Sequence, residues 1–170
     1  MQISKVFIYP IKSCRGVAVS FATLSPAGLD LDRQWMVVRE DGKFVTARQY
    51  PIMALVVPTL PEPNSSGEIE DMNGTMLVNA PSMQQLSVPL SAPLSTKGVQ
   101  GAWRPVTVWE WGGDALDEGE AAAEWFTTLL GFPCRLVRCL LVRCLFVFCI
   151  DCVKCVRLRF CVLRRTSPVF

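Results

Sequence analysis

The sequence predicts a mainly β fold, with residues 1–104 forming a small β-barrel or sandwich. Ten prolines between Pro10 and Pro105 exclude long helices from this region, because each proline removes a backbone donor and fixes φ. Glycines and prolines separate short segments that are rich in β-branched and aromatic residues, the composition of strands. The first three segments that we expect to be strands are residues 6–9, 18–24 and 35–39.

A hairpin turn is predicted after the third strand. Asp41-Gly42 stands between two apolar segments, and this dipeptide favours a type I′ turn because both central residues need a positive φ. Asn73-Gly74 repeats the signal before a strand that we expect at residues 76–78. A further strand is expected at residues 106–111. The region therefore continues as β structure beyond its first three strands.

One helix is predicted after the last of these strands. Asp117 is expected to cap its N-terminus, with Glu120 three residues further on as in a capping box. Gly131 and Pro133 are expected to end it. Apolar residues recur at helical spacing and predict one buried stripe, which we interpret as core packing. The stripe consists of Ala122, Trp125, Phe126, Leu129 and Leu130.

The composition changes near residue 139. Residues 1–138 hold 11 Lys and Arg against 14 Asp and Glu, whereas residues 139–170 hold 6 against 1. Seven of the eight cysteines lie at or after Cys134. We expect residues 139–170 to be a Cys-rich basic tail that is irregular, is not native to the fold and arose by a splice or frame change. Its CxxCxxC run could take Cys161 as the fourth thiolate of an iron–sulfur cluster, but the Gly or Pro turns usual beside such clusters are missing, so no metal site is predicted.

No targeting or membrane segment is predicted. The chain opens on alternating apolar residues, without a basic stretch followed by a long apolar run, so a cytoplasmic location is the default expectation. The apolar run at residues 139–150 contains Arg143 and is shorter than the roughly 20 residues that a spanning helix needs. We therefore expect no transmembrane span. The interleaved basic residues of the tail are not taken as a nucleic-acid site, and we expect no nucleic-acid partner.

Two cations and a hydroxyl lie at the ends of predicted strands. Lys12 and Ser13 follow Pro10, which ends the first strand and directs the chain into a loop at the rim. Arg33 lies just before the strand that begins at Trp35. Fixed cations with a hydroxyl donor are suited to holding a phosphate. The pattern predicts an anion site where two strand ends converge.

Spacing alone leaves a plainer interpretation open. Lys12 would then be an ordinary solvated lysine, and Arg33 would pair with Asp30 or Asp32. Cys14 lies beside the candidate site, but the chain contains no histidine that could activate its thiol. We expect Cys14 to be a small buried residue.

A family resemblance favours the anion site. It is carried by the runs VFIYPIKSCRGVAV, GLDLDRQWMVVREDGKFVTARQYPIMALV and APSMQQLSVPL. They resemble the N-terminal β-barrel domain of MOSC-domain proteins, a molybdenum-cofactor family that includes the amidoxime-reducing component and the C-terminal part of molybdenum cofactor sulfurase. The run VTVWEWGGDALDEGEAAAEWFTTLLGFPCRLVR is similar to the entry strand and first helix of the MOSC domain. The resemblance implies a barrel domain at residues 1–104 and an incomplete MOSC domain at residues 105–138.

The resemblance also implies roles for particular residues. In the family, the positions of Lys12, Ser13 and Arg33 bind the phosphate and pterin end of the molybdenum cofactor (molybdopterin). The family's metal-binding cysteine lies deep in the MOSC domain, in a part not matched here, so we assign no catalytic and no metal-binding residue.

The function implied is that of a molybdenum-cofactor-binding relative of enzymes that reduce N-hydroxylated compounds with electrons from a cytochrome b5-type donor. We expect the chain to be a truncated member of the family and to lack activity on its own. A sulfurase-like sulfur-transfer domain and a non-catalytic β-barrel fragment are the alternatives.

Overall fold

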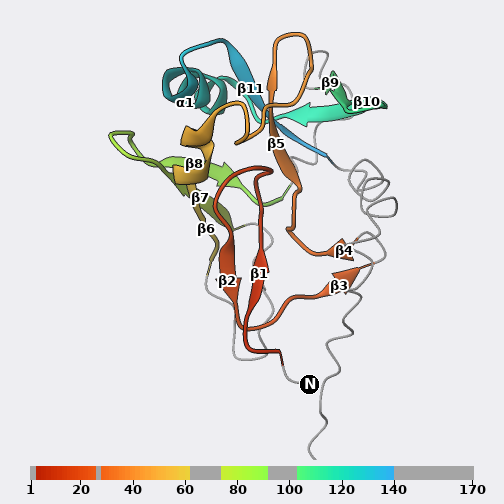
Figure 1. Ribbon diagram of the computed structural model, residues 1–170, viewed down its shortest axis with the longest axis vertical. Coiled ribbons are helices and arrows are strands. Elements are labelled where there is room, and N and C mark those ends of the chain that lie inside the picture. Colours follow the sequence, from red (N-terminus) through yellow and green to blue (C-terminus); the bar gives the residue numbers. More distant parts are fainter. Residues whose placement is uncertain (1–2, 26–27, 62–73, 92–102, 140–170) are drawn as a thin grey trace, which may run out of the picture.

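The computed structural model describes residues 3–25, 28–61, 74–91 and 103–139, and Figure 1 shows their arrangement. The described chain is mainly β, as predicted, with one α-helix and one short 3-10 helix. The strands are β1 (Val6–Ile8), β2 (Val17–Val19), β3 (Leu24–Ser25), β4 (Gly28–Leu29), β5 (Trp35–Arg39), β6 (Val57–Thr59), β7 (Thr75–Asn79), β8 (Leu86–Pro89), β9 (Trp103–Val108), β10 (Trp111–Asp117) and β11 (Cys134–Arg138). The helices are η1 (Pro51–Leu55) and α1 (Glu120–Leu130).

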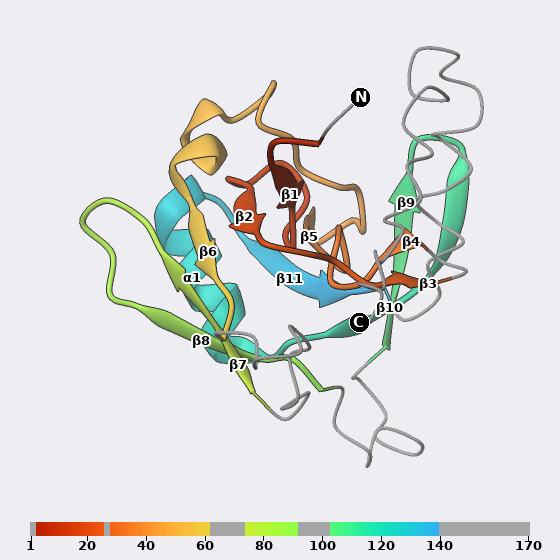
Figure 2. The same ribbon diagram turned by 90° about the horizontal axis from the view of Figure 1, so that it is seen from below.

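The strands form four antiparallel sheets. The largest has the order β5-β11-β10-β9, and the others are β6-β7-β8, β1-β2 and β3-β4. Among the described residues these sheets stay separate, so the predicted barrel is not a single closed sheet. Figure 2 shows the three-stranded sheet and the β9–β10 hairpin on opposite sides, with β1, β5 and β11 between them. The expected boundary between residues 104 and 105 falls inside β9.

β5 lies between two apolar clusters, which explains its uninterrupted run of buried residues. Successive side chains of a strand point to opposite faces. Trp35 and Val37 belong to the larger cluster, which also includes residues from β1, the β6–β8 sheet and α1. Met36 and Val38 belong to the smaller cluster, together with residues of β9, β10 and β11. β5 also pairs with β11 along its whole length, so it is fixed by both packing and hydrogen bonds.

The helix begins two residues later than expected. Its N-cap is Gly119, and no side chain caps it. Asp117 instead ends β10, where its carboxylate accepts a hydrogen bond from the Gly119 N–H at 2.8 Å and pairs with Arg104. The predicted C-terminus is confirmed, since Gly131 adopts a left-handed conformation with φ of 78°. The apolar stripe packs into the larger cluster, as expected.

The turn after β5 differs in type from the prediction. Gly42 has a positive φ of 77°, whereas Asp41 does not, so the turn is not type I′. The Gly42 N–H donates to the Arg39 carbonyl, and the Arg39 N–H donates to the Lys43 carbonyl, each at 2.9 Å. This is the pattern of a type I turn followed by a glycine bulge. The turn therefore needs one residue in the left-handed conformation, Gly42, where a type I′ turn would need both Asp41 and Gly42.

Two glycines with nearly the same φ provide a matched test of this packing. A Cβ at Gly42 would lie 2.4 Å from the Pro105 carbonyl oxygen, whereas a Cβ at Gly131 would meet nothing within 4 Å. Gly131→Ala is expected to lower the free energy of unfolding by about 1–2 kcal/mol, the cost of the left-handed backbone alone. Gly42→Ala is expected to have the same backbone cost and, in addition, to lower the free energy of unfolding by about 1–3 kcal/mol through overpacking. Urea unfolding measures both, and equal losses would contradict the close contact.

Candidate functional site

The two loops that carry the candidate cations lie side by side. One loop follows β1 and the other precedes β5, and backbone hydrogen bonds join them. The Trp35 N–H donates to the Pro10 carbonyl at 3.0 Å, and the Lys12 N–H donates to the Trp35 carbonyl at 2.8 Å. The Arg33 N–H donates to the Tyr9 carbonyl at 2.7 Å. The structure therefore brings together the segments that sequence reasoning had placed at one site.

Two of the candidate residues have an uncommon backbone conformation. Ser13 has a φ of 69° and Arg33 a φ of 53°, both in the left-handed region that favours glycine. Such a conformation costs on the order of 1–3 kcal/mol per residue and persists where the surroundings enforce it. The hydrogen bonds between the two loops hold Ser13 and Arg33 in this conformation. The backbone of the site is therefore fixed by contacts between the loops and not only by the conformational preference of each residue.

The Arg33 guanidinium is oriented by a carboxylate and an aromatic ring. It forms an ion pair with Asp32 and lies 5.4 Å from the centroid of the Tyr9 ring. The second oxygen of Asp32 accepts the Tyr9 N–H at 2.7 Å. Of the two acids that spacing left open, Asp32 is the partner of Arg33. The Arg33 side chain stays 50% exposed, so donors of its five-donor fork remain accessible to a ligand.

Lys12 is half-buried, with its ammonium 5.0 Å from the centroid of the Phe44 ring. Burial lowers the pKa of Lys12, and the positive charge of Arg33 lowers it further, while Cys139 acts in the opposite direction. No carboxylate forms an ion pair with Lys12 within the part of the chain that the structure describes. An anion placed between Lys12 and Arg33 would relieve both the desolvation and the repulsion.

Ser13 and Cys14 complete the loop. Within the described ranges, the half-buried Ser13 hydroxyl makes no hydrogen bond to another residue, so it can donate to a ligand. The Cys14 side chain is buried, and burial raises the pKa of its thiol to about 12. A thiol with so high a pKa is neither a nucleophile nor a ready metal ligand at neutral pH. Cys14 is a buried packing residue, as expected.

The donor set has the chemistry of a phosphate site. An ammonium, a guanidinium and a hydroxyl supply hydrogen-bond donors and two positive charges from adjoining loops. Phosphate oxygens accept charge-assisted hydrogen bonds, which are the strong ones. The residues present therefore fit the phosphate of a small ligand. They do not fit a metal ion, and no group of metal-binding side chains occurs among the described residues.

The lowered pKa of Lys12 predicts how anion binding depends on pH. Its pKa in the free chain lies below lysine's ordinary 10.5, so the ammonium is lost at a lower pH than in an exposed lysine. We expect affinity for a phosphate ligand to fall as pH rises through this window below 10.5. Lys12→Arg keeps its charge and is expected to retain affinity there. Calorimetric titration across this range checks both, and parallel pH profiles in the two proteins would contradict the role of Lys12.

Sequence reasoning missed a buried ion pair close to the site. Arg138 ends β11 and is 2% exposed, and its Nε donates to a Glu118 carboxylate oxygen at 2.6 Å. Its guanidinium also donates to the carbonyls of Pro89 and Leu90 at the end of β8. The signal was present in the sequence: Arg138 continues the inward-facing alternation of Cys134 and Leu136, which marks a charged residue on a buried face.

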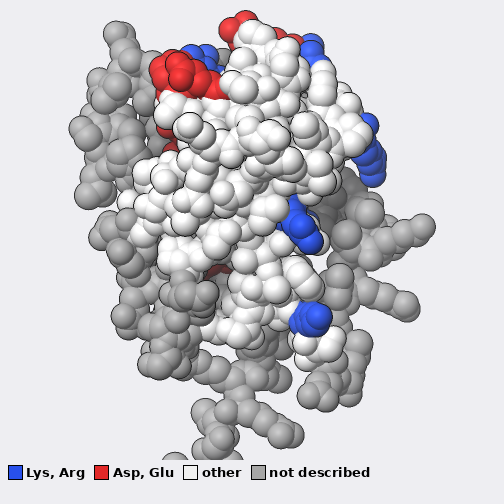
Figure 3. All heavy atoms as spheres, turned by 90° about the vertical axis from the view of Figure 1, so that its left-hand side faces the viewer, with Lys and Arg blue, Asp and Glu red and all other residues white. Residues whose placement is uncertain are grey.

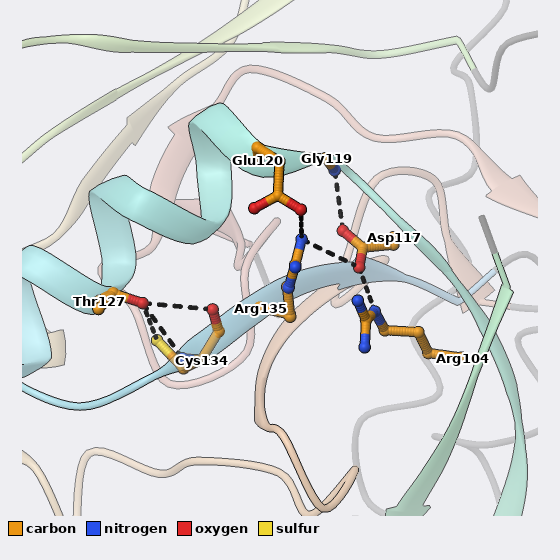
Figure 4. Close-up of polar contacts among 7 residues, drawn as sticks. All are labelled: Arg104, Asp117, Gly119, Glu120, Thr127, Cys134 and Arg135. Atoms are coloured by element: carbon orange, nitrogen blue, oxygen red, sulfur yellow. Dashed lines mark hydrogen bonds and ion pairs between the residues drawn. The ribbon is translucent and has the colours of Figure 1, made fainter. Parts of the chain in front are cut away.

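A second polar network holds the start of α1, as Figure 4 shows. Asp117 pairs with Arg104 of β9 and lies 3.6 Å from Arg135 of β11. Arg135 in turn pairs with Glu120 at 2.7 Å. These cations already have acidic partners, so this network ties the helix to the sheet and is not a free anion site.

Charge on the visible surface gives no sign of a nucleic-acid groove. On the face drawn in Figure 3, basic side chains are scattered among uncharged surface, and acidic ones gather toward the top. A continuous basic stripe, which follows a phosphate backbone, is not seen on the described part of this face. Among the described residues, no helix has both the length and the apolar character needed to cross a membrane. The Cys-rich tail lies outside the described residues, apart from Cys139.

A known protein family matches most of the chain. The family model of the MOSC N-terminal beta barrel domain matches residues 1–133. The match covers both loops of the candidate site and continues through α1.

Curated relatives give matches over a similar stretch. The chain is 36% identical to mitochondrial amidoxime-reducing component 1 of Xenopus laevis over 130 residues, which cover 74% of this chain and 33% of the relative. It is 36% identical to mitochondrial amidoxime reducing component 2 of Rattus norvegicus over 132 residues, 75% of this chain and 34% of the relative. It is 30% identical to molybdenum cofactor sulfurase of Danio rerio over 139 residues, 80% of this chain and 15% of the relative. The chain spans about a third of the length of the amidoxime-reducing relatives.

Proposed function

The chain belongs to the family of the MOSC N-terminal beta barrel domain, and we propose that it binds the phosphate-bearing pterin end of the molybdenum cofactor. Lys12, Ser13 and Arg33 are the residues proposed to hold it. The observation that supports this most is the state of Lys12, a half-buried ammonium beside a second cation and without a carboxylate partner among the described residues. A buried charge normally has a counter-ion, and a ligand phosphate would be that counter-ion.

Each residue has a distinct task in this proposal. Lys12 supplies a point charge, Arg33 supplies directed donors held in place by Asp32, and the Ser13 hydroxyl donates to a remaining phosphate oxygen. The cofactor itself supplies the molybdenum centre for chemistry on the substrate. The contribution of these residues is to bind and orient one end of it. They move no proton and touch no reacting atom.

The activity of the whole protein is proposed from its relatives. We propose a relation to enzymes of the amidoxime-reducing type. The cytochrome b5-type electron donor is proposed from the family resemblance alone. Residues 1–170 alone are expected to show no reduction of N-hydroxylated compounds, because the cysteine that binds the metal in this family has no match here. Measurable turnover would contradict that expectation. A cytoplasmic location stays a prediction, since the amidoxime-reducing relatives are described as mitochondrial.

A sulfurase-like role is the second candidate. It is supported by the match to molybdenum cofactor sulfurase over 80% of this chain. The same three residues would hold the same end of the cofactor in either role, so the binding proposal does not depend on the choice between them.

Removing the phosphate from the ligand tests the proposed function. The affinity of the full chain is measured for molybdopterin under anaerobic conditions and for the same pterin after phosphatase treatment. We expect binding to weaken by about 1.5–3 kcal/mol without the phosphate, or roughly 10- to 100-fold in Kd. Equal affinity for the two ligands would remove the assignment of a phosphate site.

A further inference from the structure

The backbone of one buried residue connects the candidate site to the interior. Trp35 is fully buried, and both of its backbone polar groups bind the loop after β1: the N–H bonds to Pro10 and the carbonyl to Lys12. Ile11 also forms a parallel bridge with Trp35. Any shift of Trp35 is therefore transmitted to the segment that carries Lys12.

The side chain of Trp35 is held by the buried ion pair. Its indole N–H donates to a Glu118 carboxylate oxygen at 2.8 Å, and the Arg138 guanidinium lies 4.9 Å from the centroid of its ring. The other Glu118 oxygen accepts from Arg138 at 3.1 Å. Glu118 is thus the acceptor common to the indole and the guanidinium, and its side chain is only 6% exposed.

The backbone around Arg138 reinforces the same connection. Arg138 pairs with Trp35 in the register between β11 and β5. The next N–H along the chain, of Cys139, donates to the carbonyl of Gln34 at 2.8 Å. Gln34 and Trp35 are therefore held by β11 and the residue that follows it, which lie roughly a hundred positions further along the sequence. Glu118 holds the Trp35 side chain in addition.

We propose that Glu118 is a positioning residue for the anion site. Its carboxylate fixes the Trp35 ring between Arg138 and the core, and the Trp35 backbone fixes the loop that presents Lys12 and Ser13. The inference rests on the proposed function, since the geometry it protects is that of the phosphate donors. A small misplacement of binding groups is costly, so loosening this loop is expected to weaken binding although Glu118 itself touches no ligand.

The test uses Glu118→Gln and Trp35→Phe in the full chain. The first removes the charge that Arg138 needs, and the second removes the indole donor while leaving the ion pair intact. Glu120→Gln is the matched control, because Glu120 also pairs with an arginine, but its side chain is 74% exposed and the Trp35 indole donates to Glu118, not to Glu120. Two quantities are measured for each variant: the Kd for molybdopterin, and the hydrogen-exchange protection of the Lys12 amide relative to amides of β7.

We expect the first two variants to raise the Kd about tenfold and to reduce protection of the Lys12 amide more than protection of β7, with the control unchanged. Equal loss of protection at Lys12 and in β7 would show general destabilisation and overturn the proposal. If Glu118→Gln does not fold, Trp35→Phe gives the same comparison. If the wild type binds no molybdopterin, the proposed function fails, while the exchange comparison still decides whether Glu118 fixes the loop.

Discussion

Arg138→Met is expected to lower the free energy of unfolding by about 3–5 kcal/mol, the usual cost of removing one partner of a buried ion pair. Among the residues that the structure describes, the substitution leaves the buried Glu118 carboxylate with only the Trp35 indole as a donor. It also leaves the carbonyls of Pro89 and Leu90 without their guanidinium donor. Since whole domains are stable by only about 5–15 kcal/mol, this loss is large. Urea unfolding followed by tryptophan fluorescence measures it.

Arg135→Met is the matched control for this substitution. Arg135 lies on the same strand, but its side chain is 21% exposed and its nearer partner Glu120 is 74% exposed. Its second neighbour, the buried Asp117, keeps the ion pair with Arg104 when Arg135 is replaced. Exposed ion pairs contribute about 0–1 kcal/mol, so a much smaller loss is expected. Similar decreases in the free energy of unfolding for the two variants would show that the buried pair of Glu118 and Arg138 contributes no more to stability than an exposed pair.

Lys12→Met is expected to weaken molybdopterin binding by about 1.5–3 kcal/mol, because it removes a charge-assisted hydrogen bond from a partly desolvated cation. The apolar chain of methionine keeps contact with the Phe44 ring, near which the Lys12 ammonium lies. Isothermal titration calorimetry measures the change. Lys43→Met is the control, since the Lys43 side chain is 72% exposed and already pairs with Asp41. Equal effects of the two substitutions would indicate general charge attraction in place of a specific contact.

The same substitution is expected not to destabilise the chain. Lys12 is half-buried and close to a like charge, so its ammonium opposes folding while no ligand is bound. Because its pKa is lowered by folding, this opposition is greatest at low pH and disappears as pH rises through the window below 10.5. The free energy of unfolding of the wild type is therefore expected to increase as pH rises through this window, and this increase should be absent from Lys12→Met. Weak binding by a variant of undiminished stability would separate function from folding.

The parts of the fold that could be predicted are those with a local signal. Trp35 to Arg39 is rich in β-branched and apolar residues and forms β5 with the expected bounds. Gly131 ends α1 because a left-handed residue is needed there. β11 was not foreseen, since arginines interrupt its apolar residues, and what stabilises it is long-range pairing with β5 and β10. The alternation of Cys134, Leu136 and Arg138 was a local sign of this strand, but an arginine on the buried face obscures it.

The candidate site divides in the same way. The convergence of the loops carrying Lys12 and Arg33 was predictable, because each loop adjoins a recognisable strand. The choice of Asp32 over Asp30 as partner was not, since it depends on how the Arg33 backbone turns. Glu118 was missed entirely as a partner of Trp35, which is 83 positions away in sequence. Its role comes from the tertiary fold, and only coordinates reveal it.

The central claim is that one phosphate is held by Lys12 together with Arg33, and the pKa of Lys12 tests it most directly. Nuclear magnetic resonance of the labelled Lys12 side chain gives this pKa with and without saturating molybdopterin. We predict that the pKa, lowered in the free chain by burial and by Arg33, rises when the ligand binds, because an anion favours the charged form. An unchanged Lys12 pKa in the presence of bound ligand would contradict the account.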